Sequence, residues 1–302
     1  MSSRDDAVRA VSPLRDQVGE SPVWSVAEQA LFWIDIEGRQ IRRYDWASGT
    51  VRSWGTRERI GSIVLREGGG LLAGMETGVF ELDLPPEGNE AVERLRFPMA
   101  FAEPGMRFND GRCDRQGRLL AGTMVADMSL AAPMGSVYAL TATRRLRPLQ
   151  GGLITPNGMA FSPDGRTMYL SDSHPSAQTV WAFDYDTDTG TPRNQRVFVD
   201  MKPLPGRPDG AALDEAGGYW ICGNDSGLVH RFTADGKLDR SIRMPVSKPS
   251  MCAFGGPELD HLFVASIRPA QPAEGFDATL DGALFVTRPG ERGIAEVPFR
   301  SR

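Results

Sequence analysis

The chain has 302 residues, of which 40% are hydrophobic and 24% are charged, values typical of a globular protein with a substantial core. Its formal net charge of −5 argues against a nucleic-acid-binding surface, because phosphate binding needs a concentrated patch of basic side chains. No run of residues approaches the roughly 18 apolar residues of a membrane-spanning helix.

The N-terminus and the cysteines bear on the compartment. The first ten residues are polar and lack the apolar stretch of a secretory signal. Cys113, Cys222 and Cys252 lie in apolar, strand-like runs, where we expect reduced core residues. A catalytic thiol is the alternative, but it would need a neighbouring histidine, and the chain has only 3. These features predict a cytoplasmic protein.

Six short apolar runs recur along the chain, and each is expected to be a strand. In chain order they are LFWIDI from Leu31, LLAGM from Leu71, LLAGTM from Leu119, MYLSDS from Met168, YWICGN from Tyr219 and LFVASI from Leu262. Their starts lie 40, 48, 49, 51 and 43 residues apart. Most follow turn residues such as the SPDG of 162–165, and several precede a second strand signal such as VWAFDY from Val180.

A repeat of this length with about four strands is typical of a β-propeller blade. Six repeats therefore predict an all-β, six-bladed β-propeller. The run ALFVT near Ala283 and the closing IAEVPF are expected to complete the ring with N-terminal residues. No linker divides the chain, so we interpret residues 1–302 as one domain in which residues 1–12 could be disordered. Two stacked sheets are the alternative, but they would not explain the regular spacing.

One position of the repeat carries oxygen in four of its six copies. Five residues before the turn of their repeats stand Glu20, Asn109, Asn157 and Asp209. Gly61 and Met251 occupy the two other copies and could leave an open face beside the oxygens. Because the innermost strand of each blade lines the channel, equivalent positions should form a ring. Carboxylate and amide oxygens suit a hard divalent cation, so the register predicts a metal site at one mouth of the central channel.

A simpler interpretation exists for each residue alone. Asn157-Gly158 and Asp209-Gly210 are common turn dipeptides, and a lone Glu20 would be a solvated side chain. Turns, however, would place such residues at scattered offsets. Two carboxylates brought together also repel each other unless a cation lies between them. The sequence contains no serine nucleophile elbow, no HExxH motif, no CxxC motif and no P-loop that would point to another chemistry.

Seven motifs follow one another along the chain: GESPVW from Gly19, RFNDGR from Arg107, AGTM from Ala121, PNGMAFS from Pro156, FDYDTDTG from Phe183, PDGAALD from Pro208 and CAFGG from Cys252. In this order they resemble the senescence marker protein / gluconolactonase / luciferin-regenerating enzyme family over essentially the whole chain. The resemblance implies a six-bladed propeller and a metal-dependent sugar lactonase, a hydrolase of carbohydrate metabolism.

The resemblance also implies roles for individual residues. The family's metal ligands fall on Glu20, Asn157 and Asp209, and its acid/base carboxylate is the same Asp209. Its substrate-contacting arginine and asparagine fall on Arg107 and Asn109.

One implied substrate contact departs from the family's pattern. Animal members carry a glutamate shortly after AGTM, and the corresponding residue here is Asp127, which has a shorter side chain. In the simpler interpretations, Asp127 caps a loop and Arg107 is a surface ion-pair partner.

The implied reaction opens an aldonolactone to its aldonic acid. The cation would polarise the lactone carbonyl, and Asp209 would act as general base on the attacking water. All-oxygen ligation suits calcium, magnesium, manganese or ferrous iron, and zinc is tolerated. The expected partner is a small sugar lactone rather than nucleic acid or a membrane. The protein is expected to be a monomer or a weak homo-oligomer.

Two other functions are open on the sequence alone. The same site could hydrolyse a non-sugar ester, such as a phosphotriester or an aromatic lactone, and a substrate panel would decide between them. A non-catalytic propeller with a structural metal is the other possibility. It should show an exposed apolar patch on its loops, whereas the loops here are mainly polar.

Overall fold

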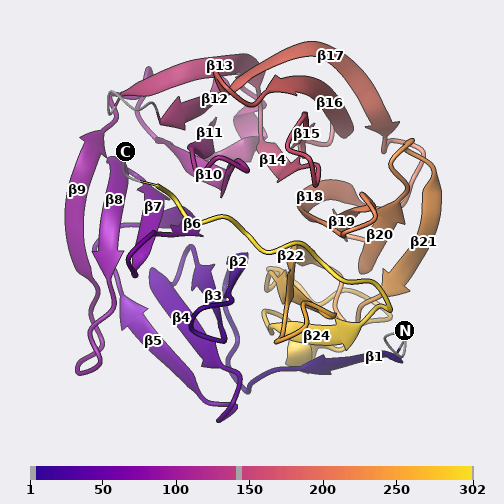
Figure 1. Cartoon of the computed structure of the whole chain (residues 1–302). Helices are drawn as coiled ribbons and strands as arrows, with labels where there is room; N and C mark the ends of the chain where they lie inside the picture. The colour runs from indigo at the N-terminus through magenta and orange to yellow at the C-terminus, as the bar shows by residue number, and fades with distance from the viewer. Residues whose placement is uncertain (1–4, 141–144, 301–302) are drawn as a thin grey trace.

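The computed structural model describes residues 5–140 and 145–300, and it is built from strands with two short 3-10 helices. Figure 1 shows six sheets arranged around a central axis, and each sheet has four strands. The prediction of an all-β, six-bladed propeller is therefore confirmed. We number the blades 1 to 6 in chain order, starting from the sheet that contains β2.

The first five blades each contain four consecutive antiparallel strands, ordered outward from the channel. Blades 1 to 3 consist of β2 (Gly19–Ser25), β3 (Ala30–Asp35), β4 (Gln40–Asp45), β5 (Val51–Gly55), β6 (Ile60–Leu65), β7 (Leu71–Met75), β8 (Gly78–Asp83), β9 (Val92–Pro98), β10 (Met106–Cys113), β11 (Leu119–Val125), β12 (Gly135–Leu140) and β13 (Leu146–Leu153). Blades 4 and 5 consist of β14 (Pro156–Phe161), β15 (Thr167–Asp172), β16 (Thr179–Asp186), β17 (Thr191–Asp200), β18 (Arg207–Leu213), β19 (Tyr219–Asn224), β20 (Leu228–Phe232) and β21 (Leu238–Arg243).

Blade 6 closes the ring with both ends of the chain. It combines β22 (Pro249–Gly255), β23 (His261–Ser266) and β24 (Phe285–Arg288) with the N-terminal β1 (Asp5–Ala10), which pairs antiparallel with β24. The run near Ala283 and the N-terminus thus complete the ring as expected.

Two expectations about the chain ends need correction. Residues 1–12 could be disordered according to the sequence, yet Asp5–Ala10 forms β1, because Val8 and Ala10 pack against the apolar core of the last blades. Residues 1–4 lie outside the described residues. The segment IAEVPF (294–299) forms no strand, and it lies across the ends of the innermost strands. That residues 1–302 form one domain stays a prediction.

The six apolar runs of the sequence are the second strands of the six blades, which explains their composition. In β3, β7 and β19 every residue is buried, because both faces of each sheet pack against a neighbouring blade. The outermost strands β9 and β17 are mostly exposed, and their sequences are correspondingly polar.

Every innermost strand carries a register irregularity near the ring position found in the sequence. The pairing shifts between Glu20 and Val23, Ile60 and Ser62, Phe108 and Gly111, Asn157 and Ala160, Pro208 and Ala211, and Pro249 and Cys252. Such bulges free a backbone stretch from the ladder and re-aim its side chains, and they are frequent beside active sites. At these bulges, the side chains near the ring position point in directions that differ from those in a regular strand.

Candidate active site

The four oxygen-bearing ring residues lie near the starts of four innermost strands. Glu20 is on β2, Asn109 on β10, Asn157 on β14 and Asp209 on β18. Asn109, Asn157 and Asp209 are only 8%, 7% and 6% exposed, so their polar atoms must find partners inside the protein or in a ligand.

A chain of hydrogen bonds joins blades 3, 4 and 5 through these residues. Arg107 Nη1 donates to Asn109 Oδ1 (2.8 Å), and Asn109 Nδ2 donates to Asn157 Oδ1 (3.0 Å). Asn157 Nδ2 donates to Ser173 Oγ (2.7 Å), whose hydroxyl donates to the Pro208 carbonyl beside Asp209. An amide oxygen has two lone pairs, so Asn157 Oδ1 keeps one for a further partner. The structure thus brings Arg107, Asn109 and Asn157 together.

Asp209 is held through one oxygen only. Asn224 Nδ2 donates to its Oδ2 at 2.6 Å, and within the described residues Oδ1 receives no hydrogen bond. Burial raises the pKa of Asp209 to about 7, against the opposing effects of Asn224 and Arg207, and the charge of Asp110 adds to the rise. A buried carboxylate with a free oxygen can accept a proton or a cation.

Glu20 lies within electrostatic range of the same carboxylate. Burial raises its pKa well above the ordinary value, and the negative charges of Asp209 and Asp110 reinforce the rise. A hydrogen bond from the Ser21 backbone N–H (3.1 Å) opposes it only in part. The fold therefore brings together carboxyl groups that disfavour one another's ionisation, and the charge of Arg107 offsets this only in part.

Asp110 is a third carboxylate of this site that the register did not single out. Its Oδ2 accepts from the Met159 backbone N–H (2.9 Å), whereas its Oδ1 is buried without a hydrogen-bond partner in the described structure. Burial raises its pKa as well. Asp110 stands inside the RFNDGR motif, and the bulge between Phe108 and Gly111 contains both Asn109 and Asp110.

Arg107 and Asp127, two of the expected substrate contacts, differ in their surroundings. Burial lowers the pKa of Arg107 to about 10, and its Nε is buried without a hydrogen-bond partner among the described residues. Asp127 is exposed and caps the 3-10 helix η1 (Met128–Leu130) by accepting from Ser129 N and Oγ at 3.0 and 2.6 Å. Its carboxylate thus has the loop-capping role, and contact with a substrate stays a prediction.

The two ring positions without oxygen are packing positions. A Cβ on Gly61 would lie 2.2 Å from the Phe108 carbonyl oxygen, so glycine is required for β6 to approach β10. Met251 packs against Gly210, where an added Cβ would lie 2.2 Å from Met251 Cγ. These residues bring neighbouring blades close, and the idea that they leave an open face is not supported.

The donor set fits a hard divalent cation. Within residues 5–140 and 145–300, no three histidine, cysteine, aspartate or glutamate side chains gather at metal-binding spacing, so the Asn157 amide would have to complete the set of Glu20 and Asp209. Carboxylate and amide oxygens are the ligands such a cation prefers. Asp110 Oδ1, which is buried without a hydrogen-bond partner among the described residues, is a further oxygen near this set.

Comparison with known families decides the relationship. Residues 18–268 match the SMP-30/gluconolactonase/LRE-like region. The chain belongs to this family. The resemblance seen in the sequence motifs is thereby confirmed.

Relatives within the SMP-30/gluconolactonase/LRE-like family span nearly the whole chain. A 6-deoxy-6-sulfogluconolactonase of Pseudomonas putida is 38% identical and covers 93% of this chain and 94% of its own length. A pentonolactonase of Haloferax volcanii is 32% identical, with 89% and 90% covered. A regucalcin of Xenopus laevis is 31% identical, with 94% and 95% covered.

Solved structures show the same family fold. A luciferin-regenerating enzyme superimposes with a TM-score of 0.91 at 26% identity, covering 97% of this chain and 99% of that chain. A calcium-binding protein, regucalcin, from Agrobacterium tumefaciens superimposes with a TM-score of 0.89 at 26% identity, covering 97% of each chain.

Two further findings concern this member of the SMP-30/gluconolactonase/LRE-like family as a whole. Its three cysteines are buried and unpaired, as predicted. In the part of the chain that the structure describes, no helix is both long and apolar enough to cross a membrane.

Asn224 is a site residue that a second repeat position could have revealed. It ends β19 where Asp35 ends β3 and Asp172 ends β15. Asp35 accepts from the backbone of Gln17 and Val18, and Asp172 accepts from the backbone at 154 and 155, so both hold the segment that leads into their innermost strand. Of these three side chains, only the Asn224 amide can donate a hydrogen bond, and it donates to Asp209.

Asn224→Asp is expected to impair the site at neutral pH. The new carboxyl group would face Asp209 Oδ2, and two adjacent carboxylates share a proton, which raises the pKa of one of them. We expect kcat for a lactone substrate to fall at least about tenfold at pH 7 and to recover partly at higher pH, as a pH–rate profile would show. Asp172→Asn, the matched change in blade 4, should lower thermal stability and leave the profile in place. An unchanged profile for Asn224→Asp would contradict the role of Asn224.

Proposed function

We propose that the chain is a divalent-metal-dependent hydrolase that opens sugar lactones to aldonic acids. The observation that carries this proposal is the position of Glu20, Asn157 and Asp209 at bulges of their innermost strands, with Asn157 bonded to Asn109 and with the charges of Asp209 and Asp110 acting on Glu20. Two of the relatives are named as lactonases of sugar acids, which supports the same reaction class.

We propose that Glu20, Asn157 and Asp209 hold the cation. When bound, the cation would supply Lewis-acid stabilisation of the negative charge that develops on the lactone carbonyl oxygen. Calcium, magnesium, manganese, ferrous iron and zinc remain candidates, and relatives named regucalcin and calcium-binding protein favour calcium among them. Coordination of a cation would also favour the ionised form of these two buried carboxyl groups near pH 7.

Asp209 would move the proton in the reaction. Asn224 fixes its Oδ2, and the unbonded Oδ1 is the oxygen that can take a proton from water as the water oxygen attacks the carbonyl carbon. As the ring C–O bond breaks, the same proton can pass to the departing ring oxygen. The product is a hydroxy acid, and no other reactant is needed.

Arg107, Asn109 and Asp127 would bind the sugar. The buried Arg107 Nε lacks a partner, and a substrate hydroxyl could supply one. Asn109 is fixed between Arg107 and Asn157, so it can place a substrate relative to the ligand set. Asp127 is exposed on the loop after β11, from which its carboxylate could meet a substrate at the cost of its bonds to Ser129.

We infer that residues 1–302 form one domain that works in the cytoplasm as a monomer or weak homo-oligomer. The buried, unpaired cysteines support a reducing compartment.

A substrate panel tests the proposed reaction. We expect turnover of five- and six-carbon aldonolactones, with or without an anionic substituent at the last carbon, at values of kcat/KM at least about a hundredfold above those for an aromatic lactone or a phosphotriester. A preference for the aromatic lactone or the phosphotriester would favour a non-sugar esterase at the same site. No hydrolysis of any compound with any of the five cations would favour a non-catalytic propeller with a structural metal.

A further inference from the structure

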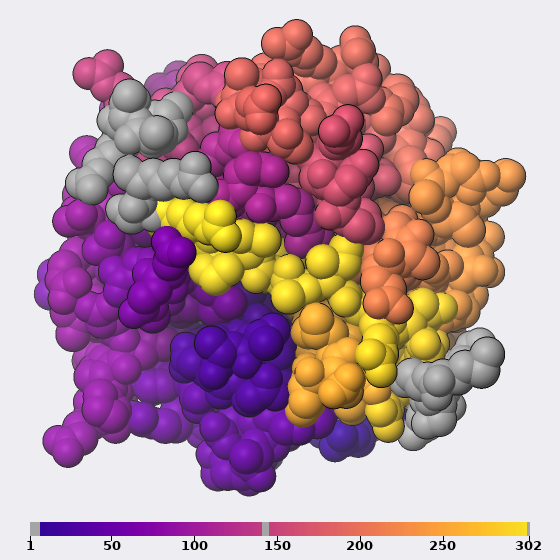
Figure 2. Space-filling view, in the orientation of Figure 1, coloured from indigo at the N-terminus to yellow at the C-terminus, as the bar shows by residue number. Residues whose placement is uncertain are grey.

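The last residues of the chain form a strap across the channel mouth opposite the ring. We call residues 289–300 the C-terminal strap. Figures 1 and 2 show this segment, in yellow, lying across the middle of the face in view. Its backbone contacts the turns that follow the innermost strands, through the bridge from Gly293 to Asp214 and the hydrogen bonds from Phe299 N to Leu65 O (2.7 Å) and from Arg300 N to Gly117 O (2.9 Å). The ring residues lie near the other ends of these strands.

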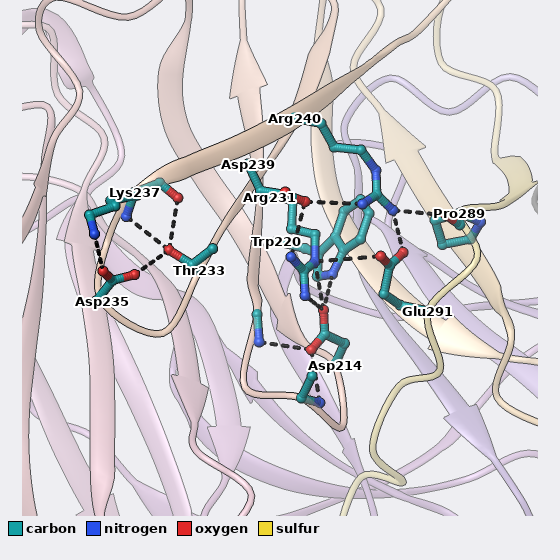
Figure 3. A network of polar contacts seen from close by, with 12 residues as sticks. Asp214, Trp220, Arg231, Thr233, Asp235, Lys237, Asp239, Arg240, Pro289 and Glu291 are labelled. Carbon is teal, nitrogen blue, oxygen red and sulfur yellow. Dashed lines mark hydrogen bonds and ion pairs between the residues drawn. The ribbon is translucent and has the colours of Figure 1, made fainter.

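An outer anchor fixes the strap to blade 5. Glu291 pairs with Arg240 and lies 3.9 Å from Arg231, which in turn binds Asp214 at 2.8 Å (Figure 3). Arg240 also donates to the Pro289 carbonyl at 2.8 Å, and its guanidinium lies 5.1 Å from the centre of the Trp220 ring. This network lies around the β18–β19 turn, away from the ring.

An inner anchor enters the channel. Glu296 pairs with Arg112, and their side chains are only 19% and 8% exposed. The other arm of Arg112, Nη2, donates to the Ala211 carbonyl of β18 at 2.7 Å. Arg112 thereby ties β10, which carries Asn109 and Asp110, to β18, which carries Asp209 two residues before Ala211.

The charge of Arg112 acts on Asp110, whose charge in turn acts on the proposed cation site. Asn109 and Arg112 are three residues apart on β10, with the register irregularity of this strand between Phe108 and Gly111. Between them is Asp110, whose charge acts on both Arg112 and the two ring carboxylates. Glu296 pairs with Arg112 from the side of the strap, and among the described residues Asp110 forms no ion pair.

We propose that Glu296 of the C-terminal strap makes Arg112 a positioning residue for the metal site, because it holds the guanidinium at the floor of the channel and on the β18 backbone. The inference rests on the proposed metal-dependent function. Without Glu296, the buried guanidinium loses its ion pair, and the other carboxylate whose charge acts on it is Asp110, which has a buried oxygen without a hydrogen bond among the described residues. A turn of Arg112 toward Asp110 would bring positive charge under the cation and loosen the tie to β18.

A merely structural pair predicts something different. If Glu296 only fastened the strap, its loss would resemble the loss of Glu291, the other carboxylate by which the strap is held. Removing Arg112 as well would then weaken cation binding further, because still more contacts would disappear. If the unpaired charge of Arg112 is what weakens cation binding, removing both Arg112 and Glu296 should restore part of the affinity.

Glu296→Gln and Glu291→Gln are the matched pair that tests the proposal. Metal-stripped proteins are titrated with Ca²⁺ and with Mn²⁺ in equilibrium dialysis, and thermal unfolding is followed in parallel. We expect Glu296→Gln to raise the Kd at least about tenfold and Glu291→Gln to change it less than about twofold. The double variant Arg112→Gln/Glu296→Gln should recover at least half of the lost affinity on a logarithmic scale.

Each outcome has a definite meaning. Equal Kd values for Glu296→Gln and the wild-type protein would overturn the proposal, and so would a double variant that binds more weakly than Glu296→Gln. If Glu296→Gln does not fold, Glu296→Asp and the double variant replace it, and the same comparison with Glu291→Gln applies. A wild-type protein that binds neither cation would instead contradict the proposed function, and the positioning role with it.

Discussion

Asp209→Asn is expected to lower kcat for aldonolactone hydrolysis by about 10³-fold. General base catalysis contributes roughly 10²- to 10⁴-fold, and the substitution removes the oxygen that can accept the proton. The amide retains the size of the carboxyl group, so the β18 bulge and the contact with Asn224 should persist. The measurement is steady-state kinetics at saturating substrate and cation, with cation binding checked separately.

Arg107→Ala is the contrasting change at the same site. Arg107 would bind substrate in both the ground and the transition state, so its loss should raise KM more than it lowers kcat. Thermal unfolding controls for misfolding. Because Asp209→Asn removes a buried charge that acts on Glu20, it should not destabilise the metal-free protein. Retained turnover in Asp209→Asn would contradict the assignment of Asp209 as the base.

The metal-free protein is expected to lose stability as pH rises, and a bound cation should restore it. Burial raises the pKa of Asp209 to about 7 and raises that of Glu20 well above its ordinary value. In the unfolded chain both carboxyl groups titrate near about pH 4. The folded state therefore holds these protons more tightly, so the contribution of these groups to stability is greatest at low pH and falls as pH rises from about 4 through about 7. The rise in Tm caused by a cation should grow between pH 5 and pH 8.

Variants isolate this contribution from the other titrating groups. Burial lowers the pKa of His230 and His261, which contributes in the opposite direction because a buried neutral histidine favours the folded state more at higher pH. The difference between the wild-type protein and Glu20→Gln/Asp209→Asn, measured without metal at each pH, removes their effect. A cation-induced shift in Tm that is the same at pH 5 and pH 8 would contradict the account.

The register of the repeat was enough to predict the fold and the ring. Equivalent positions in a propeller come from equivalent strands, so Glu20, Asn109, Asn157 and Asp209 could be aligned without any structure. When the ends of the second strands are aligned in the same way, Asn224 stands where other blades have Asp35 and Asp172.

Other features depend on contacts in three dimensions that an alignment of the repeats does not show. A bulge gives consecutive residues similar positions, and this is why Asp110 joins the site beside Asn109. Gly61 looked like an open position but is required by the close approach of β10. The segment IAEVPF has the composition of a strand, yet the N-terminal β1 already pairs with β24, so the segment binds across the channel mouth instead. The ion pair of Glu296 with Arg112 joins residues 184 positions apart.

The central claim is that the oxygens of Glu20, Asn157 and Asp209 hold a cation required to open a sugar lactone. The most direct measurement is aldonolactone hydrolysis by the wild-type protein after metal stripping, before and after Ca²⁺, Mg²⁺, Mn²⁺, Fe²⁺ or Zn²⁺ is added back. We predict that stripping reduces the rate at least about a hundredfold, that at least one cation restores it, and that the same cation restores no activity to Glu20→Gln/Asp209→Asn. Full activity in the stripped protein, or restoration in the double variant, would contradict the claim.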